Sequence, residues 1–314
     1  MPDVVCLGIV VADTIARPVR RLPRGAVALM DEVSLHGGGC ALNTGTILAR
    51  FGLTVAIAGK VGRDAFGRFL LRLMRERGLD TTAVIRGRSP TSATVVLVDP
   101  VGERTFLHAT GANGDLRLAD LDRDRLFAAR ALHVAGALLM PALDGEPTAA
   151  LLREARRRGL VTSLDTAFDA SGRWERIHPC LPHLDLLAAS LAEAGGISGE
   201  RGPERAAAWL RARGAREVAI KLGEGGAYVS GNGFEGYVPP HAVVAIDGTG
   251  AGDAFVAGLL YGKLRGWTLE RSALLANAAG ALATTATGAT EGVPGLEPVL
   301  ALAELSPVPE AERR

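Results

Sequence analysis

The chain has 314 residues, of which 48% are hydrophobic and 22% charged, and its formal net charge at neutral pH is +1. This composition suits one large α/β core, and the balanced charge excludes a general basic surface for nucleic acid or a membrane. The three cysteines, Cys6, Cys40 and Cys180, are odd in number and lack metal-ligand spacing. They therefore indicate neither a disulfide framework nor a zinc site, and they predict a cytoplasmic protein.

Taken in chain order, short apolar runs alternate with amphipathic helical stretches. The apolar start at residues 4–11 is too short to cross a bilayer and is typical of a first buried strand. Further strand-like runs lie at residues 54–61, 131–136, 160–165, 184–189 and 217–222. Helical stretches lie at residues 66–77 and 146–158. This alternation predicts a mostly parallel sheet with helices on both faces.

Two segments break this alternation. Residues 91–98 and 104–108 are strand-like and flank a turn of Asp, Pro, Val and Gly, which predicts a hairpin. With residues 15–35, this hairpin is expected to form a small separate sheet.

Residues 231–236 match the Gly-x-Gly-x-x-Gly pattern of dinucleotide-binding sites. Two prolines follow instead of a helix, so we interpret this stretch as a hairpin turn and not as a dinucleotide site.

The most informative stretch is a glycine-rich turn. The apolar run at residues 242–246 predicts a buried strand, and the apolar spacing from residue 254 onward predicts a helix. The turn between them therefore lies at a helix N-terminus, where backbone amides are unpaired and the helix dipole attracts anions. Glycines at positions 248, 250 and 252 allow the backbone to approach an oxyanion closely. The turn predicts a phosphate-binding site.

An aspartate in this first turn, Asp253, is the candidate general base. It would lie beside a bound phosphate and could accept the proton of a hydroxyl that attacks phosphorus. The alternative is that Asp253 only complements the helix dipole, which contributes roughly 0.3–1 kcal/mol. A P-loop kinase is not indicated, because no Gly-Lys pair is followed by serine or threonine.

Two longer motifs give the chain its resemblance to the ribokinase-like (PfkB-type) carbohydrate kinase family. Residues 247–253 resemble the family's C-terminal motif, with Gly248 in place of a threonine. Residues 37–43 begin the N-terminal motif, which continues through residues 48–52 and 59–67. The motifs occur in the expected order, and the resemblance extends over essentially the whole chain.

This resemblance implies a fold and an assembly. The fold is α/β, a single ribokinase-like kinase domain over residues 1–314, with a central, mostly parallel sheet flanked by helices. A small β-sheet lid is expected from residues of about 14–36 and 90–110. In the family such a lid covers the sugar and often pairs with a second subunit, so a homodimer formed through the lid is expected.

The resemblance also assigns roles to individual residues. Asp253 is the catalytic base, and the amides of the anion hole belong to Gly250, Ala251 and Gly252. The positions that bind the substrate are Asp13, Gly38, Gly39 and Asn43. Two alternatives remain open from the residues alone: Asp13 is a turn or cap residue, or Asn43 is a polar residue on a helix face.

The resemblance places ATP and Mg²⁺ as well. The positions matching the nucleotide site are Lys221, Gly223, Gly225, Thr249 and Asn277, although Lys221 and Asn277 also read as ordinary polar residues. Glu193 matches a residue that organises magnesium, and Ser190 replaces the family's asparagine, so its hydroxyl would act through a metal-bound water. Alternatively, Glu193 is a first-turn helix carboxylate.

Three further assignments belong to the same end of the predicted sheet. Asp165 and Asp169 are both candidates near the phosphates, and the sequence does not separate them. Asp247 and Thr249 match positions that help to bind a monovalent cation such as K⁺ in some relatives. Arg104 reads as a residue that reaches an acidic substrate or as a surface charge of the lid.

These residues predict an ATP- and Mg²⁺-dependent kinase that phosphorylates a hydroxyl of a small carbohydrate. One alternative is a nucleoside kinase, but only Phe106 is available for stacking across the predicted hairpin of the lid, which favours a sugar. The other alternative is a non-catalytic regulator that binds sugar or nucleotide, and the presence of Asp253 opposes it. No nucleic acid or membrane is expected as a partner.

Overall fold

The computed structural model describes residues 1–167 and 171–306 of the protein, in which two β-sheets are present. The large sheet has nine strands in the order β13-β12-β11-β10-β9-β8-β1-β4-β5. They are β1 Val4–Gly8, β4 Val55–Val61, β5 Asp80–Arg86, β8 Ala131–Ala137, β9 Val161–Thr166, β10 Leu186–Ser190, β11 Val218–Lys221, β12 Ala227–Gly231 and β13 Phe234–Val238. The pairs from β11 to β5 are parallel, and β12 and β13 are antiparallel, which confirms the predicted mostly parallel sheet.

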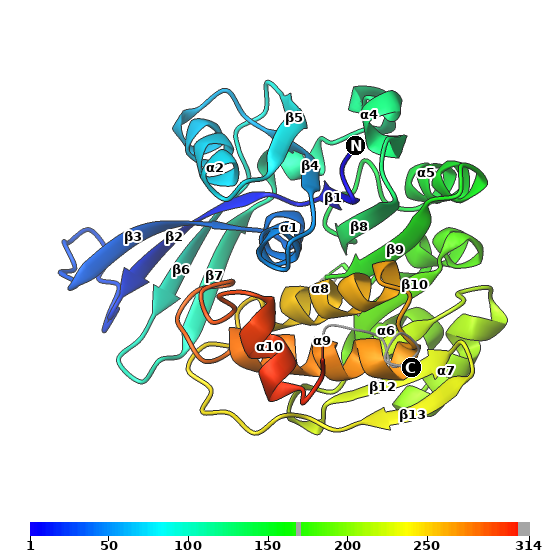
Figure 1. Ribbon diagram of the computed structural model, residues 1–314. Coiled ribbons are helices and arrows are strands. Elements are labelled where there is room, and N and C mark those ends of the chain that lie inside the picture. The colour runs from blue at the N-terminus through cyan, green and yellow to red at the C-terminus, as the bar shows by residue number, and fades with distance from the viewer. Residues whose placement is uncertain (168–170, 307–314) are drawn as a thin grey trace.

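Helices cover both faces of this sheet (Figure 1). The helices are α1 Cys40–Arg50, α2 Ala65–Glu76, α3 Gly111–Gly114, α4 Arg123–Phe127, α5 Glu146–Arg157, α6 Leu191–Ser198, α7 Pro203–Ala212, α8 Ala251–Leu264, α9 Leu269–Ala283 and α10 Leu296–Leu302, with 3₁₀ turns at Leu118–Asp120, Trp174–His183 and Gly223–Gly225. One apolar core lies under α1, α2, α8, α9 and α10, and a second lies under α4 to α7.

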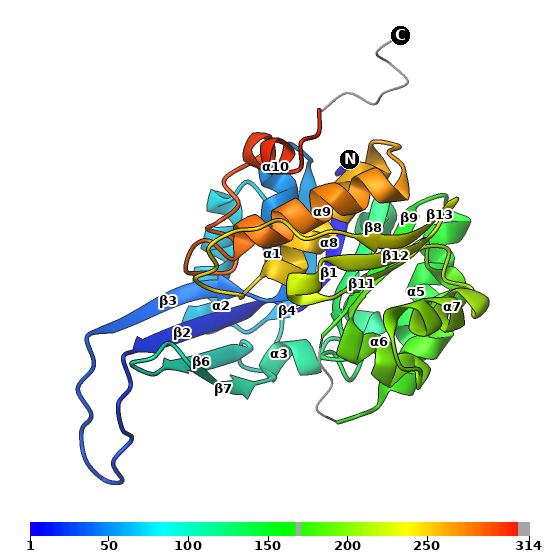
Figure 2. The same ribbon diagram turned by 90° about the horizontal axis from the view of Figure 1, so that it is seen from below.

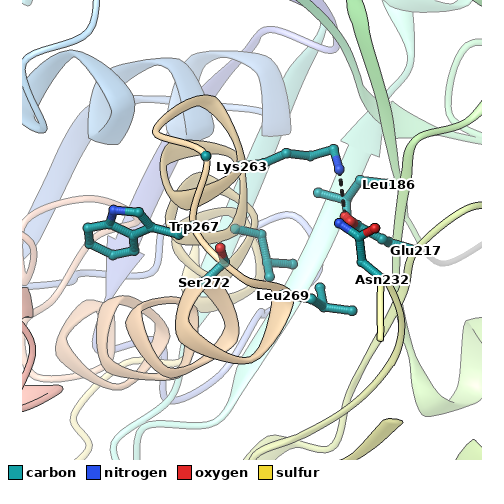
Figure 3. Close-up of a pocket in the computed structure, with 9 residues that line it drawn as sticks. Leu186, Glu217, Asn232, Lys263, Trp267, Leu269 and Ser272 are labelled. Carbon is teal, nitrogen blue, oxygen red and sulfur yellow. Dashed lines mark hydrogen bonds and ion pairs between the residues drawn. The ribbon is translucent and has the colours of Figure 1, made fainter. Parts of the chain in front are cut away.

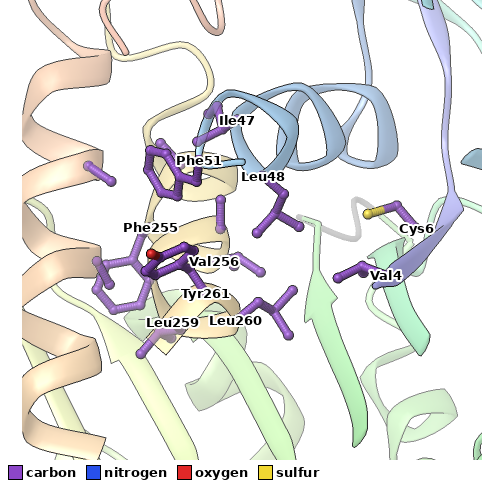
Figure 4. Packing of buried hydrophobic residues seen from close by; sticks show 14 of the residues in the cluster. Val4, Cys6, Ile47, Leu48, Phe51, Phe255, Val256, Leu259, Leu260 and Tyr261 are labelled. Atoms are coloured by element: carbon purple, nitrogen blue, oxygen red, sulfur yellow. The ribbon is translucent and has the colours of Figure 1, made fainter. Parts of the chain in front are cut away.

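Helices α1 and α8 pack directly on each other, although they are far apart in the sequence (Figure 4). Leu48 of α1 and Phe51, the C-cap residue of α1, lie against the apolar side of α8, and the Phe51 ring meets the Tyr261 ring edge-on at 5.7 Å. Nearly all of α8 is buried, because its residues are small or apolar on every side. This packing fixes the relative position of the two helix N-termini.

The small sheet forms the predicted lid. Its strands are β2 Val11–Arg17, β3 Glu32–Gly38, β6 Ala93–Val98 and β7 Arg104–Ala109, in the order β3-β2-β6-β7. The predicted hairpin is confirmed, because β6 and β7 pair in antiparallel fashion. The lid strands extend away from the core in Figure 2.

Only Ile9 and Val10 separate the core strand β1 from the lid strand β2, and both are buried. The Asn113 side chain accepts a hydrogen bond from the Val10 amide at 3.2 Å and donates one to the Val10 carbonyl at 3.1 Å. The Ala41 amide donates to the Ile9 carbonyl. The connection between core and lid is therefore held on both sides.

One predicted strand is wrong. Residues 242–246 do not pair with any described strand, and Val244 and Ile246 are 85% and 65% exposed. β13 already forms the edge of the sheet and ends before Pro239 and Pro240, which have no amide hydrogen to donate. The predicted turn at residues 231–236 is confirmed as part of the β12–β13 hairpin.

Among the described helices, none has the length and apolar character needed to span a membrane.

Candidate active site

The glycine-rich turn leads into α8 as the sequence predicts. Gly250 is the N-cap residue with φ +78°, and a side chain there would place its Cβ 2.0 Å from the Ala289 carbonyl oxygen. Only glycine fits this conformation and this approach. The backbone amides of Gly252 and Asp253 make no hydrogen bond to any described residue. These amides are free to bind an anion.

Asp253 lies in the first turn of α8 and is almost completely buried. Its Oδ2 accepts a hydrogen bond of 2.8 Å from Nδ2 of Asn43, and the Thr44 hydroxyl donates to its backbone carbonyl at 3.3 Å. Burial raises the pKa of the Asp253 carboxyl, and the hydrogen bond from Asn43 and the charge of Lys221 oppose this shift. Asn43, predicted as a sugar contact, therefore also orients the candidate base.

A second buried carboxylate, Asp165, lies at the end of β9 beside Asp253. Single side-chain atoms of Cys40, Asp165 and Asp253 lie within 4.8 Å of one another. Burial and the charge of Asp253 raise the pKa of Asp165 to about 7. The Gly136 amide donates to Asp165 at 2.8 Å, which fixes its orientation. Asp169, the other candidate, lies outside the described residues.

Behind Asp165 lies a buried histidine that the sequence analysis did not identify. His133 on β8 has its Nε2 at 3.6 Å from Asp165 and its Nδ1 at 2.9 Å from the Ser163 hydroxyl. Burial lowers the pKa of His133 to about 3, so the ring is neutral. His133 therefore adds no positive charge to the pair of carboxyl groups.

Lys221 lies beside Gly252 of the glycine-rich turn. Its Nζ lies 3.1 Å from the position that a Cβ on Gly252 would occupy, and it lowers the pKa values of both Asp165 and Asp253. Within the described part of the chain, its ammonium group has no hydrogen-bond or ion-pair partner. An unpaired ammonium group beside free helix amides suits a phosphate oxygen.

A cavity of about 380 Å³ lies between the lid and the core. Asp13, Gly39, Thr94, Arg104 and His108 contribute to its wall, together with apolar side chains of the lid strands. Asn43 and Asp253 do not line it, but Gly39 and Thr249 do, and these residues flank the starts of α1 and α8. The cavity therefore borders the buried carboxylates.

Asp13 points into this cavity from β2. Burial raises the pKa of its carboxyl to about 6, and a hydrogen bond from Thr94 partly opposes the shift. Gly38 lies directly beside it, since a Cβ there would meet Asp13 Oδ2 at 2.0 Å. The predicted substrate residues Asp13, Gly38 and Gly39 are thus neighbours, and glycine at position 38 makes room for the carboxylate.

Asp247 is bound from three sides. Its carboxylate accepts hydrogen bonds from the Thr249 amide at 2.8 Å and the Gly288 amide at 2.9 Å. Arg104 of the lid forms an ion pair with it, and the same guanidinium nitrogen donates to the Thr249 hydroxyl. Burial alone would raise the pKa of Asp247, but these hydrogen bonds lower it to about 2. Arg104 is therefore not a free surface charge.

The predicted magnesium residues form a helix cap. Ser190 precedes α6, and its hydroxyl accepts a hydrogen bond from the Glu193 amide at 3.3 Å. Glu193 Oε2 accepts from the Ser190 amide at 2.7 Å and the Thr166 hydroxyl at 3.0 Å. These bonds leave Oε1 for another partner. The pair fits Mg²⁺ held through water, since this ion commonly keeps several of its waters.

The remaining predicted nucleotide residues lie around the end of β11. Gly223 and Gly225 belong to a 3₁₀ turn just after Lys221. Asn277 of α9 is buried and donates to the backbone carbonyls of Val238 and Pro239 at 3.0 and 2.8 Å. Its amide nitrogen holds the segment after β13 against α9.

A second cavity of about 160 Å³ lies elsewhere, between the end of α8 and the start of α9 (Figure 3). It contains an ion pair of 2.8 Å between Lys263 and Glu217. Leu186 and Glu217 place it at the amino ends of β10 and β11. Ligands of open α/β sheets bind at the carboxyl ends, where Asp165 and Lys221 lie.

The residues that sequence analysis missed had no local signal. Cys40 lies within the N-terminal motif without an assigned role, and His133 belongs to no motif. Only the fold brings Cys40 to Asp165 and Asp253, and His133 to Asp165. The contact of Arg104 with Asp247 joins residues 143 positions apart. No spacing rule within one segment reports such a pair.

The site combines free helix amides, an unpaired lysine, a buried carboxylate and an adjoining cavity. These are the parts that transfer of a phosphoryl group to a hydroxyl requires. Comparison with known proteins agrees. The family model for the pfkB family carbohydrate kinases matches residues 1–295. The chain therefore belongs to the pfkB family of carbohydrate kinases.

Three relatives illustrate the similarity. The chain is 31% identical over 285 residues to a 2-dehydro-3-deoxygluconokinase of Bacillus subtilis, covering 85% of this chain and 87% of the relative. It is 34% identical over 272 residues to a fructokinase of Klebsiella pneumoniae, with 82% and 88% covered. Its fold is similar to that of an Arabidopsis thaliana ribokinase solved with ribose and ATP, with a TM-score of 0.82, 23% identity, and 97% and 99% of the two chains covered.

Proposed function

We propose that this protein is an ATP-dependent sugar kinase that transfers the γ-phosphoryl group of ATP to a hydroxyl of a small carbohydrate. The observation that carries the proposal is the position of Asp253, a buried carboxylate in the same helix turn as the free amides of the anion site. A hydroxyl and a phosphate bound there would lie within reach of one base.

In the proposed reaction the γ-phosphoryl group passes directly from ATP to the sugar. The sugar hydroxyl oxygen forms a bond to the γ-phosphorus, the bond from that phosphorus to the bridging oxygen of ADP breaks, and the hydroxyl proton moves to Asp253. The free amides of Gly252 and Asp253 and the Lys221 ammonium would bind the phosphoryl oxygens, on which negative charge lies in the transition state. The Ala251 amide, expected to belong to the anion hole, instead donates to the Gly248 carbonyl at 3.3 Å. Asn43 holds Asp253 in position through its 2.8 Å hydrogen bond.

ATP would lie along Lys221, Gly223, Gly225 and Thr249, with Asn277 of α9 beside it. When bound, Mg²⁺ neutralises phosphate charge. Glu193 would hold it through water, with the Ser190 hydroxyl as a second contact. The capping bonds of Glu193 keep its carboxylate fixed at the carboxyl end of β10.

An uncharged sugar is the acceptor that the cavity favours. The two arginines of its wall are already neutralised, Arg17 by Glu32 at 2.7 Å and Arg104 by Asp247. Burial lowers the pKa of His108, so that ring adds no charge at neutral pH. Asp13, in contrast, is a carboxylate that would repel an acidic acceptor and accept hydrogen bonds from hydroxyls.

We also propose that the protein is a homodimer in the cytoplasm, and exposed apolar side chains of the lid support the dimer. Val33 and Leu35 on β3 and Phe106 and Leu107 on β7 are between 40% and 62% exposed. β3 and β7 are the two edges of the lid sheet, and apolar edge strands pair readily with a second copy. Light scattering should give twice the mass of the chain for the wild type and the mass of one chain for Leu107→Asp. The three free cysteines suit a reducing compartment.

The experiment that tests the activity is ADP release from ATP and Mg²⁺ across a panel of acceptors. The panel contains neutral sugars, sugar acids, sugar phosphates, inositols and nucleosides, and Asp253→Asn is assayed in parallel. We expect turnover of a neutral sugar that disappears in Asp253→Asn. Turnover of nucleosides alone would replace sugar by nucleoside, and ligand binding without turnover of any acceptor would indicate a regulator.

A further inference from the structure

The turn before the anion site contains a feature that does not fit the predicted monovalent cation. Asp247 and Thr249 were expected to bind such an ion. In this structure the guanidinium group of Arg104 instead donates hydrogen bonds to their side-chain oxygens. The other hydrogen bonds to the Asp247 carboxylate come from the amides of Thr249 and Gly288. The carboxylate is thus already paired with one full positive charge.

The position of this charge connects three parts of the molecule. Arg104 is the first residue of the lid strand β7, Asp247 and Thr249 precede α8, and Gly288 belongs to the loop after α9. Among the described residues, no other lid side chain hydrogen-bonds to residues 247–249. The Arg104 side chain is 24% exposed and that of Asp247 only 4%, so the pair is shielded from bulk water.

We propose that Arg104 supplies, from the lid, the positive charge beside Asp247 and Thr249, so that this kinase works without a monovalent cation and closing of the lid completes the anion site. The proposal rests on the proposed kinase function. Arg104 acts as a positioning residue: it holds Asp247 and Thr249, and through them the turn whose next amides bind phosphate.

Electrostatic repulsion opposes the binding of K⁺ beside Asp247 while the Arg104 guanidinium is there. Two unit charges 4 Å apart repel by about 4 kcal/mol at the effective dielectric constant of a protein surface. A K⁺ ion beside Asp247 would also have to displace a guanidinium that already bonds to the carboxylate and the hydroxyl. An arginine on the chain is present at a high effective concentration, which a free ion in solution cannot match.

The test compares the wild type with Arg104→Gln and Arg104→Lys. Glutamine removes the charge at similar length, and lysine retains it. Arg72→Ala is the matched control, because the Arg72 side chain is 71% exposed on α2, forms an ion pair with Glu76 and lies far in the sequence from the turn that Arg104 holds. Each protein is assayed with its best acceptor in KCl, NaCl and tetramethylammonium chloride at equal ionic strength, and its thermal unfolding is followed in the same salts.

We expect the wild type, Arg104→Lys and Arg72→Ala to have the same kcat in all three salts. Arg104→Gln should lose activity and regain it in KCl by about tenfold, which corresponds to ~1.4 kcal/mol. Its unfolding temperature should also rise in KCl relative to tetramethylammonium chloride, because a bound ion stabilises the folded state.

Two results would overturn the proposal. One is activation of the wild type by K⁺, and the other is an Arg104→Gln variant whose activity and unfolding temperature are indifferent to the salt. The unfolding measurement needs no substrate. A K⁺-dependent rise confined to Arg104→Gln therefore supports the role of Arg104 even if the protein proves not to be a kinase.

Discussion

Nδ2 of Asn43 donates a 2.8 Å hydrogen bond to Oδ2 of Asp253, across 210 positions of sequence. The two residues begin different helices, α1 and α8, whose apolar sides pack together. The other amide atom, Asn43 Oδ1, is buried without a hydrogen-bond partner. A buried acceptor without a partner is costly, which supports the proposed role of Asn43 as a contact for a donor brought by a ligand.

Replacing Asn43 by alanine should lower kcat and move the acid side of the pH profile upward. The hydrogen bond from Asn43 favours the charged form of Asp253, so without it the pKa of Asp253 rises further. The measurement is kcat as a function of pH for both proteins. An unshifted profile in a variant that still folds, judged by thermal unfolding, would contradict this role.

Asp253→Asn should reduce kcat by roughly 10²–10⁴-fold, the usual contribution of a general base. Binding of the sugar and of ATP should change little, because an amide has the same shape as the carboxylate. Calorimetric titration of each ligand and steady-state ADP release give the two quantities. Near-normal turnover would remove Asp253 from the mechanism.

Turnover should fall on acidification at a higher pH than an ordinary aspartate would cause. Burial raises the pKa of Asp253, and only the ionised carboxylate accepts a proton, so activity is present above this pKa and is lost as the pH falls through it. Asp165 lies beside Asp253, and burial and the charge of Asp253 raise its pKa to about 7. Asp165 is therefore largely protonated below pH 7, and Asp165→Asn, which mimics that neutral form, should leave the acid side of the profile nearly unchanged.

Asp13→Asn should raise the KM for the sugar more than it lowers kcat. Hydrogen bonds to a charged group contribute about 1.5–3 kcal/mol, which corresponds to roughly ten- to a hundredfold in affinity. The wild-type KM should also rise as the pH falls through about 6, where Asp13 takes up a proton. Asp31→Asn is the control, because the Asp31 side chain is exposed in the lid and is not among the side chains that line the cavity. Equal KM values for Asp13→Asn and the wild type would refute the contact.

Gly250→Ala and Gly248→Ala form a matched pair in one turn. A Cβ at position 250 would lie 2.0 Å from the Ala289 carbonyl, at φ +78°, whereas one at position 248 would meet nothing within 4 Å. Gly250→Ala should lower the unfolding temperature and abolish phosphate binding, and Gly248→Ala should do neither. Similar behaviour of the two variants would show that the turn adapts.

Much of the fold was predictable, because hydrophobic alternation reports burial directly. Apart from β5, which was not predicted, the strands of the parallel sheet lie where their apolar runs place them, and so does the β6–β7 hairpin. Residues 242–246 form a similar apolar run but do not form a strand. A strand also needs the free edge of a sheet to pair with, and the spacing of apolar residues does not report whether such an edge is available. The mistake leaves the site unaffected, because Gly250 and the start of α8 are set by local backbone chemistry.

The site was predictable where one segment contains its parts, as in the turn from Asp247 to Asp253. It was not predictable where two segments meet. The bond of Asn43 to Asp253 and that of Arg104 to Asp247 depend on the packing of α1 on α8 and on the direction in which the lid extends. The charge of a residue is visible in the sequence, but the group that neutralises it is not.

The two-residue connection at Ile9 and Val10 determines how the lid can move. Asn113 and the start of α1 hold this connection, so its backbone has little freedom to rotate as a hinge. Opening of the lid must then come from bending along its strands, with the largest displacement far from the core and the smallest at Asp13. Acceptors would enter from the outer end of the cavity, while Asp13, the proposed contact for their hydroxyls, stays in place.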